Sequence, residues 1–560
     1  MHHGREKVIN PMEKFKTVLL DFRNKITPIK KRNKDKTDYF NFDLIEVYFK
    51  KKTHPSSFQV INDRIINDMD LLEVFMLIDM THSKIGQQYF YNQILDINKK
   101  IDFTQQEQLI DFFNANETDL LSVQSLLSKL NKREVYYICN LFLDEYIPKP
   151  KWFWMMQVLS LAGFVAAGAC IFFTSGYTIL FFLLIYITNM VIHFRNKKNI
   201  MVYMESIPQL PLLSRIAREL ASMNFMHDSK TSVLHSVASI NEMRPIIRFF
   251  KLDTNIKSEI EALILLIWEA IKILLLIEPL VIFNTFKRLE NKKNDIRNLF
   301  EYTGKIDSAI SIAAMRKNNP NFCKPLLINT NQGLSFTDLY HPLIPDCVTN
   351  SLAIKNKSIL LTGSNMSGKT TFIRTIAINV LLGQTINTCF AHTFQFAQSH
   401  VYSAIRVSDD LANDKSYYFE EVTIVKDMII NSLSTENHIF FLDEIFKGTN
   451  TVERIAAGKA ILSFLAKSSN NLVFVSTHDI ELADLLSGEY DLYHFTESIE
   501  GDTIHFDYTL KPGYLYTKNA IRILEINNYP EEIISDAKSQ TVKLLDQTHP
   551  KGSGVSVRLV

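Results

Sequence analysis

A run of 41 residues, from Trp152 to Ile192, contains no aspartate, glutamate, lysine or arginine. About 20 apolar residues are enough for a helix to cross the ~30 Å hydrocarbon layer of a membrane, so this run is long enough for two crossings. Thr174, Ser175 and Gly176 provide a turn near its middle. The run therefore predicts a hairpin of two membrane-spanning helices. A pair of helices buried in a protein core is the alternative, but core helices seldom extend so far without a charged residue.

Positive residues flank both ends of this run. Lys149 and Lys151 precede it, Arg195, Lys197 and Lys198 follow it, and the turn carries none. Cytoplasmic flanks of membrane helices are enriched in lysine and arginine. We therefore expect a two-helix hairpin over residues 151–195 in the cytoplasmic membrane, with both ends on the cytoplasmic side. Residues 152–194 would contact the membrane lipid.

The overall charge and the cysteine pattern exclude several classes of protein. In 560 residues, 61 lysines and arginines balance 60 aspartates and glutamates. This balance excludes a uniformly basic nucleic-acid coat and an acidic disordered chain. The five cysteines form no CxxC pair, which excludes zinc ribbons and disulfide scaffolds and suits a reducing compartment. The N-terminal residues carry charges throughout, unlike a signal peptide.

Two helical regions flank the predicted hairpin. Residues 60–150 and 196–310 have apolar residues at helical spacing and few helix breakers. We expect them to form the two halves of one helical domain, with the hairpin inserted between them. In the second half, the apolar stretch from Ile260 to Phe283 is interrupted by four charged residues and by Pro279. It predicts a buried helix kinked at the proline, with a helix on the membrane surface as the alternative.

The two ends of the chain differ from the rest in composition. Residues 1–59 include lysine-rich runs at 30–36 and 50–52. These runs predict a solvated basic segment, and binding to anionic lipid or to nucleic acid is the alternative. Residues 547–560 are predicted to be a disordered tail.

From about residue 325 the pattern changes. Short apolar runs rich in β-branched residues, at 358–361, 439–442 and 472–475, alternate with helical stretches. This alternation is typical of a mainly parallel sheet with crossover helices. We therefore expect an α/β domain over residues 311–510.

A phosphate-binding loop follows the first of these runs. The segment from Gly363 to Thr370 has the complete GxxxxGK[ST] pattern between a predicted strand and a predicted helix. Its glycines let backbone N–H groups wrap around phosphates at a helix N-terminus. Lys369 is expected to reach the β- and γ-phosphates and Thr370 to bind Mg²⁺, so the sequence predicts ATP and Mg²⁺ as cofactors. The predicted ATP-binding residues are Gly363, Ser364, Asn365, Met366, Ser367, Gly368, Lys369, Thr370 and Thr371.

Two more of the apolar runs end in polar residues with possible catalytic roles. The run at 439–442 ends at Asp443 and Glu444, and the run at 472–475 leads to His478. Parallel strands bring their carboxyl ends to one edge of a sheet, where ligands bind. Asp443 is expected to hold Mg²⁺ with Thr370, and Glu444 to orient or deprotonate the attacking water. His478 is expected to contact the γ-phosphate. Solvated strand-end acids and a structural histidine are the alternatives.

Several motifs together resemble the MutS mismatch-repair family. The phosphate loop and the segments 442–451 and 476–478 are similar to the ATPase domain of that family. Segments 307–311 and 341–342 also fit the family, and segment 71–86 is similar to the start of its helical core domain. Segment 519–530 is similar to its dimerising C-terminal end. The resemblance implies a P-loop NTPase domain of ABC-like architecture, an all-α core or lever domain, and ATP hydrolysis by a homodimer.

The resemblance also implies a loop that acts across the dimer. Segments 405–411 and 416–421 are similar to the family's signature loop, which completes the ATP site of the opposite subunit. The residues assigned to this role in trans are Asp409, Asp410, Ser416 and Glu421. Two positions depart from the family pattern. Ser364 stands where the family usually has proline, and Val348 stands where an aromatic ring commonly stacks on adenine.

The expected organisation is therefore a series of segments around one ATPase. They are a basic N-terminal segment (1–59), two halves of a helical core or lever domain (60–150 and 196–310), a transmembrane hairpin (151–195), an ATPase domain (311–510), a helical dimerisation segment (511–546) and a tail (547–560).

Only about sixty residues precede the part that resembles the helical core domain, and no Phe-x-Glu wedge occurs in them. That length is too short for the family's mismatch-reading and connector domains. We expect a dimeric, membrane-anchored ATPase that couples ATP to DNA binding, either mismatch-repair-like or in branched-DNA processing, without a mismatch-reading wedge. The alternative is a membrane-tethered, ATP-driven signalling or assembly switch that does not bind DNA.

Overall fold

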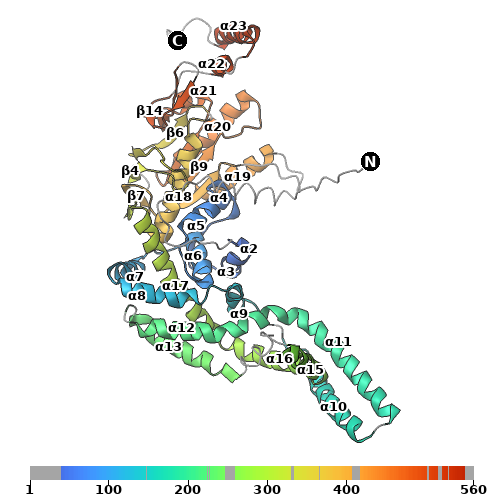
Figure 1. Ribbon diagram of the computed structural model, residues 1–560. Coiled ribbons are helices and arrows are strands. Elements are labelled where there is room, and N and C mark those ends of the chain that lie inside the picture. Colours follow the sequence, from blue (N-terminus) through green and yellow to red (C-terminus); the bar gives the residue numbers. More distant parts are fainter. Residues whose placement is uncertain are drawn as a thin grey trace, which may run out of the picture.

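The structure, a computed structural model, describes residues 40–548 apart from residues 147, 174, 224, 226 and 365 and segments 246–258, 330–332, 407–416, 501–502, 515–519 and 527–528. The molecule is elongated, with strands gathered at one end, helices in the middle and a two-helix hairpin at the opposite end (Figure 1). It is a mixed α/β protein with mostly helical content.

The middle of the molecule is a bundle around one long helix, α17 (Lys293–Asn318), which contacts α6, α7 and α13. The remaining helices of this bundle are α4 (Asp63–Asp68), α5 (Leu71–Ile78), α6 (Lys84–Leu95), α7 (Thr104–Ala115), α8 (Glu117–Ser128), η1 (Arg133–Cys139), α9 (Asn140–Leu143), η2 (Ile207–Gln209), α12 (Leu210–Ser222) and α13 (His227–Asn241).

Two segments that the sequence analysis singled out, 71–86 and 307–311, meet in this bundle. The buried Asp307 carboxylate of α17 accepts hydrogen bonds from the backbone N–H groups of His82 and Ser83, both at 2.8 Å, just before α6 begins. The Ser311 hydroxyl accepts from the N–H of Met80 at 2.8 Å. Since the first N–H groups of a helix have no partner within it, α17 supplies part of the cap that starts α6.

Residues 40–59 differ from the expected solvated segment. They form helices α2 (Phe42–Ile45) and α3 (Val47–Lys51) and strand β1 (Ser57–Val60), which pairs with β2 (Asp96–Asn98). Tyr48 is buried, and its hydroxyl donates to Glu301 at 3.0 Å. Burial of the aromatic and apolar side chains holds this segment against the bundle, although lysines lie next to them in the sequence. Residues 40–59 are therefore part of the helical bundle. The run at 30–36 lies outside the described residues.

The hairpin consists of α10 (Phe153–Phe172) and α11 (Gly176–Ser206), which pack side by side and project from the bundle away from the strands (Figure 1). α10 and the first part of α11, Gly176–Asn196, are each long and apolar enough to cross a membrane. Only 17% of the residues in the most apolar window of each helix are buried. A pair of core helices would be mostly buried, so this alternative is wrong. The two helices of the predicted hairpin are present, and their insertion in a membrane stays a prediction.

The prediction of one buried helix kinked at Pro279 is wrong. The chain breaks earlier, between α15 (Glu259–Leu274) and α16 (Ile277–Glu290), where Leu276 has a φ of 47°. Pro279 lies in the first turn of α16, where its missing N–H group needs no partner. The second half of the stretch is buried as expected, whereas α15 exposes several apolar side chains.

The expected mainly parallel sheet is present. Its strands lie in the order β14 (Lys511–Pro512), β11 (Tyr490–His494), β6 (Ser358–Thr362), β10 (Asn471–Ser476), β9 (His438–Asp443) and β8 (His400–Ala404), and only β14 is antiparallel to its neighbour.

Alternate residues along these strands face opposite sides of the sheet. On one side, Ile359 and Leu361 pack in a core shared with α18 (Lys369–Ile386) and the helical bundle. On the other side, Leu360 packs in a core with α19 (Tyr417–Asn431), α20 (Thr451–Ala466) and α21 (Ile480–Leu486). α18 also contacts α6 and β2, so it lies between the sheet and the bundle.

A second, smaller sheet lies beside the first, in the order β3 (Leu326–Ile328), β7 (Thr393–Ala397), β4 (Ser335–Leu339) and β5 (Asn350–Ala353). The expected domain boundary at 310/311 falls inside the continuous α17. The described part of the α/β region therefore begins after this helix ends at Asn318.

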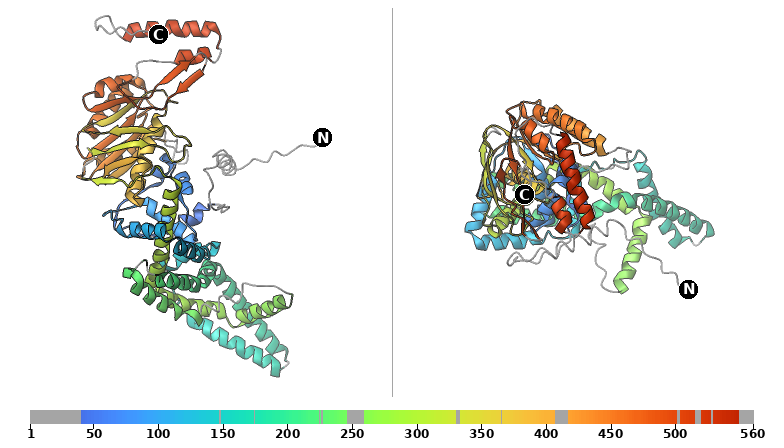
Figure 2. Two further views of the ribbon diagram at one scale, coloured as in Figure 1. Left: turned by 60° about the vertical axis from the view of Figure 1, so that its left-hand side comes forward. Right: turned by 90° about the horizontal axis from the view of Figure 1, so that it is seen from above.

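The C-terminal part contains a hairpin of β12 (Glu497–Glu500) and β13 (Thr503–Phe506), followed by α22 (Ala520–Ile526) and α23 (Glu531–Thr548). α23 extends two residues into the predicted tail, because the first helix breaker there is Pro550. Residues 549–560 lie outside the described residues. Figure 2 shows this helix at the opposite end of the molecule from the hairpin α10–α11.

Candidate active site

Three neighbouring strands bring the predicted site residues to one edge of the sheet. β10 pairs in parallel with β6 on one side and with β9 on the other. The loop after β6, the acids at the end of β9 and the histidine after β10 therefore meet at their carboxyl ends, as the sequence predicted.

The loop after β6 turns tightly into helix α18. Gly363 has a φ of 137°, and a Cβ atom there would lie 2.6 Å from the carbonyl oxygen of Phe495, so only glycine fits. Gly368 precedes α18 with a φ of 104°. The Ser367 hydroxyl donates to the carbonyl of Ser364 at 2.8 Å, while Met366 is largely exposed. Asn365 lies outside the described residues.

Lys369, the first residue of α18, is turned into this loop. Its Nζ donates to the carbonyl oxygens of Gly363 and Ser364, both at 2.7 Å. The side chain is buried, and burial lowers the pKa of Lys369 to about 8, against the opposite effect of Asp443 and Glu444. A buried ammonium that is held only by carbonyl oxygens is well suited to take an anionic partner.

Thr370 and Asp443 are in direct contact. The Thr370 hydroxyl donates to Asp443 Oδ2 at 2.6 Å, and the Ser476 hydroxyl donates to Asp443 Oδ1. Hydroxyl and carboxylate oxygens are the ligands that Mg²⁺ prefers. The two residues that the sequence assigned to Mg²⁺ thus fit such an ion, and Ser476 orients the carboxylate. Thr371 follows in the first turn of α18, where its carbonyl accepts from the Thr375 hydroxyl.

Glu444 is held by two side chains and has an unusual backbone conformation. His478 Nε2 lies 2.5 Å from Glu444 Oε1, and Lys447 Nζ lies 2.5 Å from Oε2. The hydrogen bond with His478, helped by Lys447 and opposed by burial, lowers the pKa of Glu444 to about 2. Its φ is 53°, a left-handed conformation that costs roughly 1–3 kcal/mol for a residue other than glycine and is often found at functional sites.

The residues predicted to act in trans are only partly described. Asp409, Asp410 and Ser416 lie outside the described residues. Glu421, in α19, is buried, and its Oε1 accepts from the N–H of Phe446 at 2.5 Å within the same chain. Burial raises the pKa of Glu421 to about 6. Glu421 therefore supports the turn that follows Glu444.

Residues on both sides of segment 407–416 are anchored to the helical bundle. Arg406 Nη1 lies 2.5 Å from Asp70 Oδ1, and the N–H of Arg406 donates to Asp68 at 2.9 Å. On the other side, Arg64 Nη2 lies 3.0 Å from Glu420 Oε1. Arg374 of α18 also lies 3.4 Å from Asp70. Arg406 and the helix α18, which follows the phosphate loop, thus share a partner in Asp70, just before α5 begins.

Three residues near the phosphate loop or Glu444 were not predicted from the sequence. Glu497 accepts a hydrogen bond from the Ser364 hydroxyl at 2.8 Å. The ring of Tyr508 lies 3.1 Å from the position of a Cβ atom at Gly368. Lys447 pairs with Glu444. Of these three, only Lys447 could have been assigned to the site from the sequence, because it lies three residues after Glu444. Val348, where an aromatic ring was noted as missing, is part-exposed.

Comparison with known families identifies this region of the chain. Residues 359–545 match the family model described as MutS domain V. The match begins in β6 and ends in α23, so it includes the phosphate loop, Asp443, Glu444 and His478.

Proposed function

Since the chain is a member of the MutS family through domain V, an ATPase-type domain, we propose that it binds ATP with Mg²⁺ at the edge of the main sheet and hydrolyses it to ADP and phosphate. The observation that carries this proposal is the meeting of the loop lysine, the Thr370–Asp443 pair and Glu444 at the ends of three adjacent strands. The fold around it is proposed to be that of a P-loop NTPase.

In the proposed reaction, the loop from Gly363 to Thr371 binds the phosphates, and Lys369 exchanges its two carbonyl partners for phosphate oxygens. Thr370 and Asp443 would hold Mg²⁺, which neutralises charge on the β- and γ-phosphates. A carboxylate with a pKa near 2 is a weak base, so Glu444 mainly orients the attacking water. His478, which touches Glu444, is proposed to contact the γ-phosphate.

The nucleotide state would reach the helical bundle through two sets of contacts. α18 begins in the phosphate loop and packs on α6. Asp70, at the start of α5, pairs with Arg374 of α18 and with Arg406 beside the loop 407–416. A movement of either partner changes the position of α5, so we propose movement of the bundle as the output of the ATP cycle.

We propose a homodimer in which the loop 407–416, with Asp409, Asp410 and Ser416, completes the partner's ATP site, and in which residues 511–546 contribute to dimerisation. The support is the resemblance of these segments to their counterparts in the family. Glu421 has a supporting role in its own subunit in this proposal, because its carboxylate is already engaged there.

We also propose that residues 151–195 anchor the dimer in the cytoplasmic membrane, with the ATPase on the cytoplasmic side. The exposure of the two apolar helices supports this anchoring. The proposed domains are a helical bundle interrupted by the hairpin, an ATPase region after Asn318 and the C-terminal helices.

The output is proposed to be coupled to DNA, because the MutS family is related to mismatch repair. A second function, an ATP-driven membrane switch without DNA, is favoured by one feature. The hairpin arises from the same bundle that contacts α18, so a movement of the bundle is transmitted directly to the membrane helices.

The first experiment is ATP turnover by the purified full-length protein carrying Lys369→Ala. Loss of the charge partner should abolish hydrolysis and weaken ATP binding by about 30-fold, which corresponds to about 2 kcal/mol for a hydrogen bond to a charged group. Lys357→Ala is the matched control, since Lys357 is a part-exposed lysine whose Nζ donates to the carbonyl of Ser487, away from the phosphate loop. Unchanged turnover in Lys369→Ala would show that the site is assigned wrongly.

A further inference from the structure

Helix α15 crosses the hairpin. Seen from above, this yellow-green helix projects to one side of α10 and α11 and does not run along them (Figure 2, right). It contacts both hairpin helices. If the hairpin axis is perpendicular to a membrane, α15 lies close to the membrane plane.

Side chains of the hairpin hold the C-terminal end of α15. Asn189 Nδ2 of α11 donates to the carbonyl of Leu274 at 2.6 Å, and the Ser160 hydroxyl of α10 donates to the carbonyl of Leu275 at 2.7 Å. A Cβ atom at Gly163 would lie 2.5 Å from the same Leu274 carbonyl, so α10 approaches the α15 backbone closely. The last carbonyls of a helix need donors, and here the hairpin supplies them.

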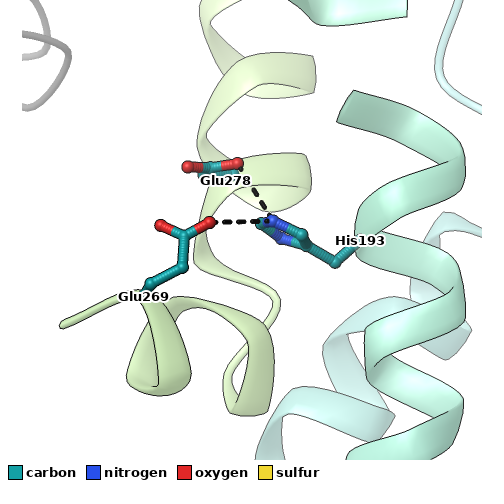
Figure 3. A group of neighbouring side chains, drawn as sticks. All are labelled: His193, Glu269 and Glu278. Carbon is teal, nitrogen blue, oxygen red and sulfur yellow. Dashed lines mark ion pairs between the residues drawn. The ribbon is translucent and has the colours of Figure 1, made fainter. Parts of the chain in front are cut away.

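Two charged residues near the C-terminal end of α15, Glu269 and Lys272, point toward the protein. Lys272 Nζ lies 2.5 Å from Glu269 Oε2 and 2.8 Å from Glu278 Oε1. His193 of α11 lies between the same two carboxylates, with its Nε2 3.5 Å from each (Figure 3). His193, Glu269 and Glu278 have the spacing of a metal site, but Lys272 already places a cation between the carboxylates. The cluster therefore ties α15 and α16 to α11.

The opposite side of α15 is apolar and exposed. Ile264, Ile267 and Ile271 have the i, i+3, i+7 spacing of one helix face, and Leu266, which precedes Ile267 in the chain, is also exposed. Their exposed fractions are 59%, 52%, 37% and 69% in that order, and we call these four residues the α15 face. A helix that faces water exposes its charged side chains and buries its apolar ones. In α15 the paired charges of Glu269 and Lys272 face the protein, and the isoleucines are exposed.

The contacts also define the depth of α15 in a membrane. The second apolar span ends at Asn196. At 1.5 Å per residue, His193 lies about 5 Å and Asn189 about 10 Å inside that end. Helices that lie in the membrane interface bury their apolar side about 5–10 Å below the headgroups. The residues of α15 that contact His193 and Asn189 fall in this range.

We propose that α15 is a third lipid-contacting element, an interfacial helix whose α15 face is covered by acyl chains at the cytoplasmic boundary of the bilayer. This inference rests on the proposed insertion of the hairpin. The occupant is lipid because the α15 face is apolar and exposed like the surface of α10 and α11, and because the Asn189 and Ser160 hydrogen bonds fix the C-terminal end of α15 to these two helices.

The experiment uses the full-length protein reconstituted in phosphatidylcholine vesicles, with Cys170, Cys323 and Cys347 replaced by serine. The buried Cys139 and Cys389 are kept. One accessible cysteine, at Ile267 in α15 or at Leu184 in the hairpin, is labelled with bimane and exposed to lipids spin-labelled at acyl position 5 or 12. Leu433→Cys, on an exposed turn after α19, is the control outside the membrane.

We expect at least twofold quenching at position 267, stronger with the shallow label, and at position 184, stronger with the deep label, and none at position 433. Quenching at 184 without quenching at 267 would overturn this inference and leave the hairpin in place. Loss of quenching at both positions would overturn the proposed membrane insertion itself. Excimer formation by pyrene at position 267 in place of lipid quenching would show that a second copy covers the α15 face, which also contradicts the inference.

A second measurement needs no change in α15. Trp152→Phe with Trp154→Phe leaves Trp268 as the single tryptophan of the chain. Brominated lipids should quench its fluorescence by half or more. Fluorescence that is insensitive to brominated lipid but quenched by aqueous iodide would contradict the proposal even if the labelled variants did not fold.

Discussion

At the scale of single residues, Glu444 is the side chain whose surroundings say most about its role. Glu444→Gln keeps the size of the side chain and removes its charge. ATP binding should be retained, because the phosphates are bound by the loop and by Lys369, whereas turnover should fall by about 10²–10⁴-fold, the usual contribution of such a group. Phosphate release and equilibrium binding of a fluorescent ATP analogue measure the two effects separately.

Glu489→Gln is the matched control for this change, since Glu489 is an exposed glutamate of the same region whose nearest cation, Lys459, is 3.9 Å away. Its turnover should equal that of the unmodified protein. If Glu444→Gln lost ATP affinity and turnover together, Glu444 would belong to the binding loop and not to the hydrolytic step.

Lys369 predicts a pH dependence of ATP affinity. Its pKa in the free loop is about 8 because of burial, and the phosphates of bound ATP raise it. The bound state therefore holds the proton more tightly than the free state, so affinity is full below pH 8 and falls as the pH rises above 8. Binding constants at pH 7, 8 and 9 measure this fall.

Lys369→Arg, whose guanidinium stays charged over this pH range, should bind ATP with an affinity that is independent of pH from 7 to 9. An equal loss of affinity in both proteins would mean that another group titrates.

Local motifs made part of this site predictable. Thr370 and Lys369 occur in a contiguous pattern, and Asp443 and Glu444 end a strand whose direction follows from the parallel sheet. Glu497 and Tyr508 were not predictable, because they reach the loop from more than 130 residues away. Such contacts depend on how β12 and the segment after β13 are placed against β6, which no short sequence pattern encodes.

At the scale of elements, the hairpin gives the clearest topological prediction. In a Cys170→Ser background, Ser175→Cys should react with a membrane-impermeant maleimide added to intact cells, because Ser175 lies at the exposed turn between α10 and α11. Lys149→Cys, before α10, should react only after permeabilisation. Release of the full-length protein by carbonate alone would contradict the membrane-spanning arrangement.

The hairpin was predictable because the absence of charge over two helix lengths leaves few other structures. The neighbouring α15 and α16 were not, because Glu269, Lys272 and Glu278 look like charges on a solvated face until the fold places them around His193. The prediction of a domain boundary at 310/311 was wrong for a similar reason. Helical spacing continues through α17, and the change in sequence texture comes only after that helix ends.

At the scale of the whole molecule, α18, which begins at the proposed ATP site, and the hairpin α10–α11 are joined by one connected set of helices and lie at its two ends (Figure 1). α18 contacts α6, α6 packs on α17, and α17 packs on the short helix α9 that precedes the hairpin. Buried side chains along this path belong to one continuous core. Closely packed cores transmit displacements because they contain little free volume. The proposed nucleotide site could therefore act on the distant hairpin through this core.

The same arrangement limits how DNA can be recognised. The described part of the N-terminal segment is folded into the bundle, where Tyr48 and Phe49 are buried. These rings cannot be inserted between base pairs, which is how many proteins probe distorted DNA. Contacts to DNA would then be made mainly by lysine and arginine to phosphates, which position a protein without reading the bases.

We therefore predict that homoduplex and single-mismatch duplex bind the detergent-solubilised, nucleotide-loaded dimer with affinities within about 1 kcal/mol of each other. A specific base contact would separate them by roughly 1–3 kcal/mol. Both affinities should fall steeply between two salt concentrations, because phosphate contacts release counterions. A mismatch preference that persists at high salt would reveal a reading element outside the described residues. Absence of binding to both duplexes, and to a branched DNA of equal length, would instead favour the membrane switch.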